Sequence, residues 1–442
     1  MTIEEAKKKL AAEGQEQVLA FWKKLSAKER TALLAQIARI DFKALARMKA
    51  MLKAAPERAK KQAAPMPAPV VEWKPKTYAA AQARGERELA AGRVAVLLVA
   101  GGQGSRLGFD GPKGAYPIGP LTDAPLFHFH ARKILALQLR YGARIPFYVM
   151  TSEVNHAATV KCFADADYFG LDKKDVVFFT QGMWPALDAG GKIMLDAPGH
   201  IFMSPDGHGG VLSALDRTGC LKDMKKRGIR SVFFFQVDNP MVEIADPAFI
   251  GLHVAEKADI SLKLCAKRDP YEGLGVVVKR GKTFSMIEYS ELSDAQATKR
   301  RANGELYFKY GSVAIHVFSL AFMVKEAKWA MPLHIAHKKI PVVDAKGKVV
   351  KPEKPNGCKF EKFIFDVLPD AKKVINLAFD RAEEFSPVKN AEGNDSPATC
   401  KRDLQAKWRR WMGAPADADF PVEIDPVYAR CAEDLQEMGV WL

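Results

Sequence analysis

The sequence has few cysteines and no cysteine pattern that would hold a fold together. Its six cysteines are scattered over 442 residues, and no two of them form a C-x-x-C pair. Neither a disulfide framework nor a zinc site is indicated, and this usage is typical of a reducing compartment. The chain therefore has to fold by burying apolar side chains, for which its hydrophobic content of 48% is sufficient.

Long hydrophobic runs are missing as well. No apolar run approaches the length of a membrane span, and the N-terminus MTIEEAKKKL lacks the apolar core of a signal peptide. We therefore expect a soluble cytoplasmic protein without a membrane partner.

Negative charge is in short supply, and the formal net charge is +15. About half of the excess lies in residues 1–61, where 15 Lys/Arg face 7 Asp/Glu. This segment has a helical pattern: Val18 and Trp22 share one face, and Ser26 with Glu29 forms a capping box. Its lysines are best explained as solvated helix faces. Because no interleaved aromatics or nucleic-acid motif accompany the charge, we expect no nucleic-acid partner.

Two well-known glycine motifs for nucleotides are absent, although glycine is concentrated in one stretch. Residues 94–120 read VAVLLVAGGQGSRLGFDGPKGAYPIGP. A dinucleotide fingerprint would need a third glycine where Leu107 stands. A P-loop would need Gly-Lys-Ser/Thr, but Lys113 lies between Pro112 and Gly114. Binding of NAD and Walker-type binding of ATP are therefore disfavoured.

The same stretch does contain a buried strand and a loop suited to phosphate. Val94–Ala100 is apolar without interruption, which is typical of a strand buried on both faces of a parallel sheet. Glycines then dominate the loop, and glycine lets backbone N–H groups approach a phosphate closely. With Arg106 and Lys113 as cations, the loop predicts a site for a polyanion such as a nucleoside triphosphate. The candidate nucleotide-binding glycines are Gly101, Gly102 and Gly104 in this loop, and Gly207 further along the chain.

This loop resembles the GGxGxRLG and PKG signature of the UDP-sugar pyrophosphorylases, in particular the eukaryotic-type UDP-N-acetylglucosamine pyrophosphorylases. Further motifs of that family follow in the family's order, and the similarity spans about Phe21 to Asn390. The resemblance implies a Mg²⁺-dependent uridylyltransferase that makes UDP-sugar and pyrophosphate from UTP and a hexose 1-phosphate. The alternative is a regulator that binds sugar nucleotides in the same pocket without turnover.

The order of predicted elements favours an α/β fold with a doubly wound, Rossmann-like mixed sheet. Residues 124–141 and 155–166 are predicted as helices, the second one capped, and residues 146–150 and 176–180 as strands. Ligands bind such sheets beyond the carboxyl ends of the strands. Later in the chain, the pattern predicts helices over residues 211–226, 359–367 and 425–438, and strands over 274–278 and 284–291. The predicted domains are an N-terminal helical module with a linker (1–90), a nucleotidyltransferase catalytic domain (91–380) and a small C-terminal domain (381–442).

Several candidate site residues follow predicted strands. Asp238 comes after the apolar run Ser231–Val237, where a carboxylate would face the ligand crevice and suit Mg²⁺. Gln181 follows the strand at 176–180, and the resemblance implies that it contacts the uracil base. Lys389 lies in a segment that resembles E-F-S-P-x-K-N, whose lysine meets the phosphates. Arg106, Lys113 and Lys389 are thus the implied catalytic cations.

The sugar side departs from the closest family pattern. The loop with Gly207 and His208 has histidine where the N-acetylglucosamine enzymes usually have asparagine, and Ser312 also stands in place of an asparagine. The resemblance places Glu288 toward the sugar hydroxyls. A histidine ring would crowd a 2-substituent, so we expect glucose 1-phosphate or galactose 1-phosphate to be used at least as well as N-acetylglucosamine 1-phosphate.

If the glycine loop binds the triphosphate, Lys113→Ala and Arg106→Ala should each lower turnover far more than stability. Both residues are predicted on a loop rather than in a core, and losing a charge-assisted contact to the developing charge should raise the barrier by about 2–4 kcal/mol. Steady-state kinetics with UTP, beside denaturant unfolding of the same variants, measures both effects. Normal turnover in either variant would reject its role.

Overall fold

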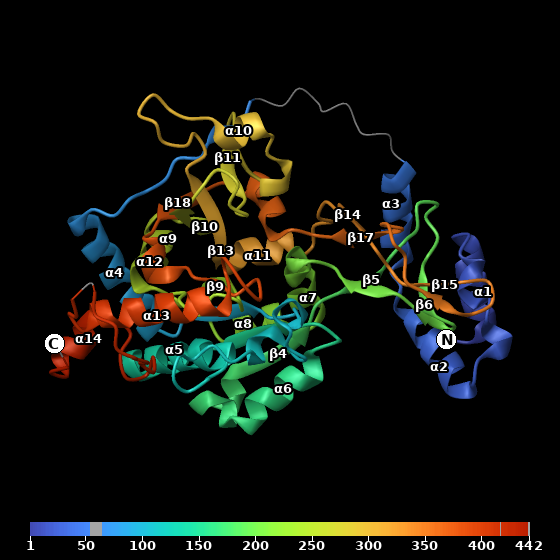
Figure 1. Ribbon diagram of the computed structural model, residues 1–442, viewed down its shortest axis with the longest axis horizontal. Coiled ribbons are helices and arrows are strands. Elements are labelled where there is room, and N and C mark those ends of the chain that lie inside the picture. The colour runs from blue at the N-terminus through green and yellow to red at the C-terminus, as the bar shows by residue number, and fades with distance from the viewer. Residues whose placement is uncertain (54–63, 416, 441–442) are drawn as a thin grey trace. The chain divides into compact units, whose positions relative to one another are not determined.

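The computed structural model describes residues 1–53, 64–415 and 417–440, and their contacts group into two units. Unit 1 consists of residues 1–53 with Gly182–Val211 and Ala330–Asp366, and unit 2 consists of the rest. Figure 1 shows both units coloured along the chain. This grouping differs from the three predicted segments, because two stretches from the middle of the chain pack with the N-terminal helices. Residues 54–63 of the predicted N-terminal module and linker lie outside the described residues.

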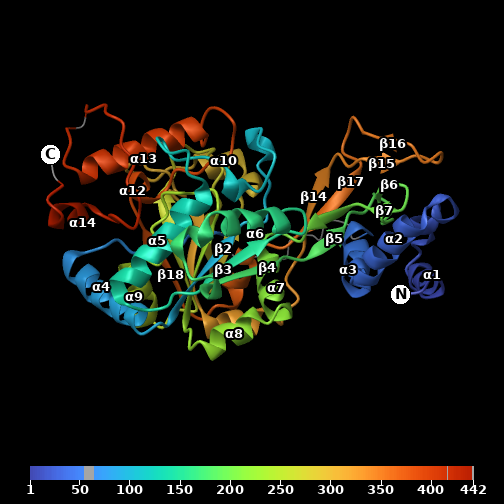
Figure 2. The ribbon, with the colours of Figure 1, turned by 90° about the horizontal axis from the view of Figure 1, so that it is seen from below.

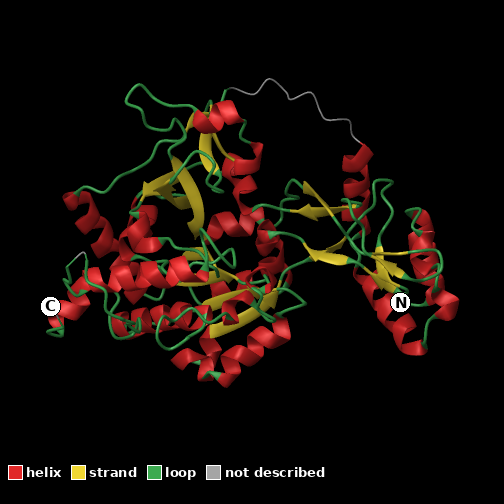
Figure 3. Ribbon diagram, in the orientation of Figure 1, coloured by secondary structure: helices red, strands yellow, loops and turns green. Residues whose placement is uncertain are grey.

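A ten-stranded mixed sheet forms the centre of unit 2 (Figure 3). Its main path runs in the order β1-β11-β13-β9-β2-β3-β4, with β12 beside β11 and with β10 and β18 extending from β13. Strands β9, β2, β3 and β4 are parallel, whereas β13 is antiparallel to β9. The predicted mixed α/β architecture is therefore confirmed. The strands are β1 (Met66–Pro67), β2 (Val94–Val99), β3 (Phe147–Thr151), β4 (Val176–Thr180), β9 (Ser231–Gln236), β10 (Ile260–Ala266), β11 (Val276–Arg280), β12 (Thr283–Ile287), β13 (Tyr310–Ser319) and β18 (Val374–Ala378).

The four parallel strands end at the same level. Val99 of β2 is paired with Met150 of β3 and with Gln236 of β9. Thr151 of β3 is paired with Thr180 of β4. Segments that leave these strands at their carboxyl ends therefore share one edge of the sheet, which is where ligands bind in open α/β folds.

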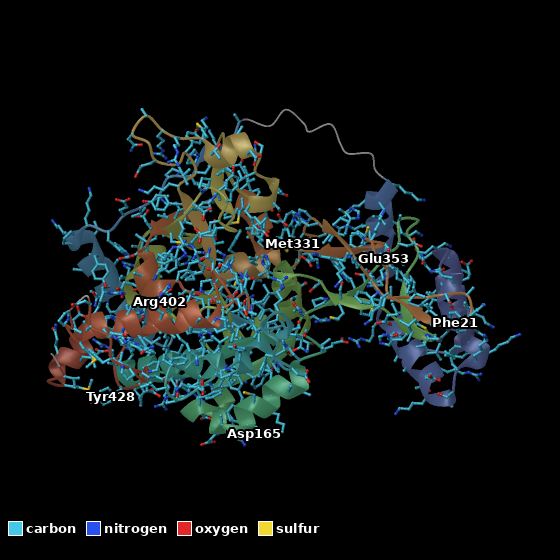
Figure 4. The ribbon with its side chains drawn as sticks, viewed as in Figure 1. Phe21, Asp165, Met331, Glu353, Arg402 and Tyr428 are labelled. Atoms are coloured by element: carbon cyan, nitrogen blue, oxygen red, sulfur yellow. The ribbon has the colours of Figure 1, made fainter. Side chains whose placement is uncertain are left out.

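Helices pack onto this sheet through one apolar core. Phe127 of α5, Phe163 of α6 and Phe249 of α9 are fully buried in the cluster that contains alternate residues of β2. Figure 2 shows the helices around the sheet from a second direction, and Arg402, labelled in Figure 4, lies on α13. The helices of unit 2 and its boundary are α4 (Pro75–Ala90), α5 (Leu126–Tyr141), α6 (His156–Asp165), α7 (Val211–Arg217), α8 (Cys220–Lys226), α9 (Pro247–Ala255), α10 (Asp294–Thr298), α11 (Leu320–Glu326), α12 (Arg381–Glu384), α13 (Pro397–Trp411) and α14 (Ala432–Glu437).

Unit 1 combines three helices with four short two-stranded sheets. Leu33 and Ile37 of α2 are buried in a core with Trp184 and Phe360 from the inserted stretches. Arg47 of α3 donates to the backbone oxygen of Met331, which Figure 4 labels. The elements are α1 (Ile3–Ala12), α2 (Ala27–Arg39), α3 (Phe42–Lys53) and the strand pairs β5 (Met183–Pro185) with β8 (Met203–Pro205), β6 (Leu195–Ala197) with β7 (His200–Ile201), β14 (His334–Lys338) with β17 (Gly357–Glu361), and β15 (Val342–Val343) with β16 (Val349–Val350).

Several local predictions are corrected by the structure. The helix predicted over 359–367 is wrong in its first part, because residues 357–361 pair with β14 as β17, whereas residues 364–367 begin the 3-10 helix Ile364–Asp370. The helix predicted over 211–226 is interrupted at Gly219, whose φ of +80° ends the turn between α7 and α8. The strand predicted to reach residue 291 ends at Ile287, and only 432–437 of the predicted last helix is helical.

The N-terminal pattern is correct in one part and wrong in another. The capping box of Ser26 and Glu29 is present at the start of α2. Val18 and Trp22 instead lie in two short 3-10 turns, Glu16–Leu19 and Trp22–Lys24. Within the described residues, no helix has both the length and the apolar character needed to cross a membrane.

Candidate active site

The glycine loop leaves β2 and folds back on itself. The backbone N–H of Gly104 donates to the oxygen of Gly111 at 2.9 Å, and that of Lys113 donates to the oxygen of Gly102 at 3.1 Å. Lys113 begins a 3-10 turn, Lys113–Ala115, that closes the loop. Two residues far apart in the loop sequence, Gly102 and Lys113, are thereby hydrogen-bonded neighbours at the end of β2.

Gln181 lies directly against this loop. A Cβ atom placed on Gly101 would come within 2.6 Å of the Nε2 atom of Gln181, so only glycine permits this approach. The Gln181 side chain is buried, and its backbone N–H donates to the oxygen of Thr151 at the end of β3. The structure thus brings the predicted uracil-reading residue and the predicted nucleotide loop together, although they are about 80 residues apart in sequence.

The predicted cation Lys113 lies beside the predicted metal ligand Asp238 and near the other two predicted cations. The Nζ atom of Lys113 is 3.8 Å from the Oδ2 atom of Asp238, and both side chains are largely buried. Burial lowers the pKa of Lys113 below its usual value, Asp238 opposes this, and the nearby charges of Arg106 and Lys389 lower the pKa further. Arg106 and Lys389 therefore both lie within electrostatic reach of Lys113, and the Nζ atom of Lys389 is also 3.9 Å from the Oδ2 atom of Asp395. Such an excess of positive charge favours a polyanionic ligand.

The segment that carries Lys389 is fastened to the segment that carries Asp238. The backbone N–H of Val388 donates to the oxygen of Asp238 at 2.8 Å. The buried side-chain amide of Asn239 donates to the oxygen of Glu384 at 2.7 Å and accepts from the N–H of Ser386 at 3.1 Å. Asn239 was not predicted to have a site role, because a V-D-N triplet alone does not show where its amide points.

A buried ion cluster of Lys263, Asp246 and Glu384 stabilises this junction. The Nζ atom of Lys263, on β10, is 2.9 Å from Asp246 and 2.5 Å from Glu384. Burial alone would lower the pKa of Lys263, but the two carboxylates outweigh burial and raise it. If Glu384 moved away from Lys263, an uncompensated buried charge would remain. The ion pair therefore fixes Glu384, and with it the start of the Lys389 segment.

Two predicted sugar-side residues meet at Gly275. The backbone N–H of Ser312 donates to the oxygen of Gly275 at 2.8 Å, and a Cβ placed on Gly275 would lie 3.1 Å from the Oε1 atom of Glu288. Ser312 and Glu288 are both half-buried. The structure therefore places Ser312, on β13, and Glu288, directly after β12, on either side of Gly275, which immediately precedes β11.

Gly207, predicted to bind the nucleotide, and His208, predicted to bind the sugar, belong to unit 1. Gly207 has a φ of +84°, and a Cβ there would come within 2.4 Å of the Lys362 oxygen, so this turn requires glycine. The ring of His208 stacks on Phe363 with centroids 5.4 Å apart and an interplanar angle of 18°. The segment 362–365 was missed as a partner because the pattern predicted a helix there.

His208 is a neutral imidazole in a defined tautomer. The backbone N–H of Ile364 donates to its Nδ1 atom at 3.2 Å, so the ring hydrogen is on Nε2. Phe363 and Phe365 pack against the ring and shield much of it from water, and the residue is half-buried. This burial lowers the pKa of His208 to about 4, and the carboxylate of Asp366 only partly opposes the effect.

The carboxylate of Asp238 is the only predicted metal ligand. In the part of the chain that the structure describes, no three His, Cys, Asp or Glu side chains come together as a metal site. Mg²⁺, however, is commonly held by one or two carboxylates together with substrate phosphates rather than by a protein cage. A single acid at a strand end, beside a loop that suits phosphates, fits that mode of binding.

Known proteins are similar to this chain over most of its length. The family described as UTP–glucose-1-phosphate uridylyltransferase matches residues 42–394. UDP-N-acetylhexosamine pyrophosphorylase-like protein 1 of Xenopus tropicalis is 38% identical over 432 residues, which covers 93% of this chain and 84% of the relative. UDP-N-acetylglucosamine pyrophosphorylase of Saccharomyces cerevisiae is 38% identical over 361 residues, covering 78% and 76%.

A solved structure shows the same fold. The crystal structure of the uridine diphosphate N-acetylglucosamine pyrophosphorylase from Trypanosoma brucei, in complex with inhibitor, matches with a TM-score of 0.84 and 30% sequence identity. The match covers 98% of this chain and 93% of that chain.

The neutral state of His208 leads to a pH prediction. Because its pKa lies near 4 in the folded chain and near 6.5 in the unfolded one, only the unfolded chain takes up this proton as the pH falls from 6.5 to 4. The wild type should therefore lose more stability over this interval than His208→Asn, as measured by denaturant unfolding at each pH. Between pH 6 and 8, the two proteins should show pH–activity profiles of the same shape. An inflection near pH 6.5 that disappears in the variant would contradict the neutral assignment.

Proposed function

This chain belongs to the UTP–glucose-1-phosphate uridylyltransferase family, and we propose that it transfers the uridylyl group of UTP to a hexose 1-phosphate and releases pyrophosphate. The observation that carries the proposal is the meeting of Gln181, the glycine loop and three cations at the carboxyl ends of the parallel strands. A base-reading amide beside an excess of positive charge suits a pyrimidine nucleoside triphosphate.

In the proposed complex, the chain binds the two ends of the nucleotide with different groups. The amide of Gln181 can donate and accept at once, as the uracil edge requires. Backbone N–H groups of the glycine loop, with Lys113 and Arg106, would bind the triphosphate. Lys389 would hold the phosphate of the incoming sugar. The backbone N–H of the preceding residue, Val388, donates to the backbone oxygen of Asp238, and this hydrogen bond keeps Lys389 close to the site.

The reaction requires no covalent enzyme intermediate. An oxygen of the sugar 1-phosphate attacks the α-phosphorus of UTP, the bond from this phosphorus to the oxygen that bridges to the β-phosphorus breaks, and pyrophosphate leaves with that electron pair. The residues act by aligning two anions and by neutralising the charge that grows on the leaving group. Asp238 would hold Mg²⁺, which supplies additional positive charge to the phosphates when bound.

For the acceptor, we propose N-acetylglucosamine 1-phosphate as the first candidate. The relatives at 38% identity that carry an activity in their names are named for UDP-N-acetylhexosamine or UDP-N-acetylglucosamine. Glucose 1-phosphate and galactose 1-phosphate are the second candidates, favoured by His208 and Ser312 in the places where asparagines are expected.

Incubating the protein with UTP, Mg²⁺ and each sugar 1-phosphate, while pyrophosphate is measured, tests the proposal. Release of pyrophosphate that depends on one sugar phosphate supports uridylyl transfer and identifies the acceptor. Tight binding of UDP-sugars with no pyrophosphate from any of the three sugars would instead support the non-catalytic regulator.

We expect His208→Asn to move the sugar preference toward N-acetylglucosamine 1-phosphate. An amide can pair both the carbonyl and the N–H of an acetamido group, whereas the His208 ring has only Nε2–H to offer, and an unpaired polar group costs about 1–3 kcal/mol. The measurement is the ratio of kcat/KM for N-acetylglucosamine 1-phosphate over glucose 1-phosphate, which should rise about tenfold.

The exposed His200 provides the matched control, because His200→Asn makes the same substitution in unit 1 at a residue with no predicted role. An equal ratio in wild type and His208→Asn would remove His208 from sugar selection. A wild type that prefers glucose or galactose 1-phosphate would establish the second candidates in place of the first.

Asp238→Asn should abolish most of the Mg²⁺-dependent activity while the fold is retained. The amide keeps the shape of the side chain but loses the charge that a hard divalent cation requires. Titrating activity with Mg²⁺ in the variant, and in the exposed control Asp216→Asn, measures the effect. Superimposable magnesium curves for Asp238→Asn and wild type would exclude Asp238 as a metal ligand.

A further inference from the structure

Asn155 is fully buried and uses every hydrogen-bonding position of its amide. Its Nδ2 atom donates to the backbone oxygens of Ala100 at 2.8 Å and of Gly102 at 3.1 Å. Its Oδ1 atom accepts from the backbone N–H of Ser152 at 2.8 Å and from the Ser152 hydroxyl at 3.1 Å. One side chain thus connects the segment after β3 to the glycine loop after β2.

This orientation is not the one that the local sequence favours. Asn155 immediately precedes α6, and an asparagine at that position commonly caps the helix, which typically contributes about 1 kcal/mol. The sequence accordingly predicts a capped helix, yet Asn155 makes no side-chain capping bond to α6. Its side chain is instead directed to the loop, so its position is set by the glycine loop rather than by the helix that follows.

The two carbonyls that Asn155 binds determine which way the loop amides point. In a planar trans peptide the C=O and N–H groups point in opposite directions. Holding the oxygens of Ala100 and Gly102 therefore turns the N–H groups of Gly101 and Gln103 to the other side of the chain. The same Gly102 oxygen also accepts the backbone N–H of Lys113, so Lys113 is fixed to the same peptide.

We propose that Asn155 is a positioning residue that presents the N–H groups of the glycine loop, and the backbone of Lys113, to the phosphates of UTP. The inference rests on the proposed function for the identity of the nucleotide. Asn155 touches no substrate in this arrangement, because both of its donors are occupied by loop carbonyls.

Two variants test this role. Asn155→Leu has a similar volume, carries no charge and loses all of these hydrogen bonds. Asn155→Asp keeps the size of the side chain and the acceptor for Ser152, but it cannot donate to Ala100 or Gly102 and it adds a buried charge. In both, we expect the Kd and KM for UTP to rise about tenfold or more, while the KM for the sugar 1-phosphate changes less than about threefold.

Asn376 on β18 provides a matched control. It is also buried, and its Nδ2 atom donates to the backbone oxygen of Pro69 at 3.0 Å, far along the sheet from the glycine loop. Asn376→Leu and Asn376→Asp make the same chemical changes, so they should lower stability without changing the Kd for UTP. A purely structural role for Asn155 predicts the same behaviour for both pairs of variants.

The decisive readout is the Kd for UTP measured by calorimetry without any sugar phosphate. It applies whether or not the wild type turns over, so wild-type binding without turnover would defeat the proposed reaction while still testing Asn155. An unchanged Kd in a folded Asn155→Leu protein would overturn the inference. A loss of affinity in Asn155→Asp but not in Asn155→Leu would also overturn it, because charge repulsion would then be the cause.

Discussion

The alignment of four parallel strands is the constraint on which the site depends. Because β9, β2, β3 and β4 are parallel and in register at their carboxyl ends, the segments that follow them emerge at one edge. The glycine loop, Gln181 and Asp238 are contributed by three of these exits. None of these groups would meet if one strand ran the other way, since its exit would then lie at the opposite edge of the sheet.

Bringing the glycine loop, Gln181 and Asp238 to one edge is not sufficient for a defined site, because the loops that follow the strands need contacts with other segments to keep one conformation. Two buried asparagines supply the missing restraints: Asn155 ties the glycine loop to the end of β3, and Asn239 ties the Lys389 segment to the end of β9. The pKa of Lys113 is lowered mainly by burial, and the repulsion from Arg106 and Lys389 lowers it further. Hydrogen bonds between neutral amides and backbone groups hold such a site without adding charge. Lys263 restrains the start of the Lys389 segment further, through its ion pairs with Asp246 and Glu384.

The sequence alone was sufficient to predict the parallel strands of the core and the residue types of the site. The apolar runs at 94–100, 146–150 and 176–180 became β2, β3 and β4 with boundaries shifted by at most one residue, because strands buried on both faces leave an unambiguous pattern. β17 was not predictable in this way, since a short, half-exposed strand exists only through its pairing with β14. The role of Asn155 could not be predicted from the sequence for a related reason. An asparagine before a helix can either cap that helix or bind the backbone of a neighbouring loop, and only the fold decides between the two.

His208 illustrates how the fold narrows what a residue can do. An asparagine at that position could offer two donors and one acceptor to a sugar substituent, whereas histidine could in principle donate, accept or carry charge. The N–H of Ile364 occupies Nδ1, and burial against Phe363 removes the charged form at neutral pH. What is left is a single donor at Nε2. A group that only accepts, such as a carbonyl oxygen, can be satisfied by this donor, and a hydroxyl can accept from it. The N–H of an acetamido group gains nothing there and must find its acceptor on another segment.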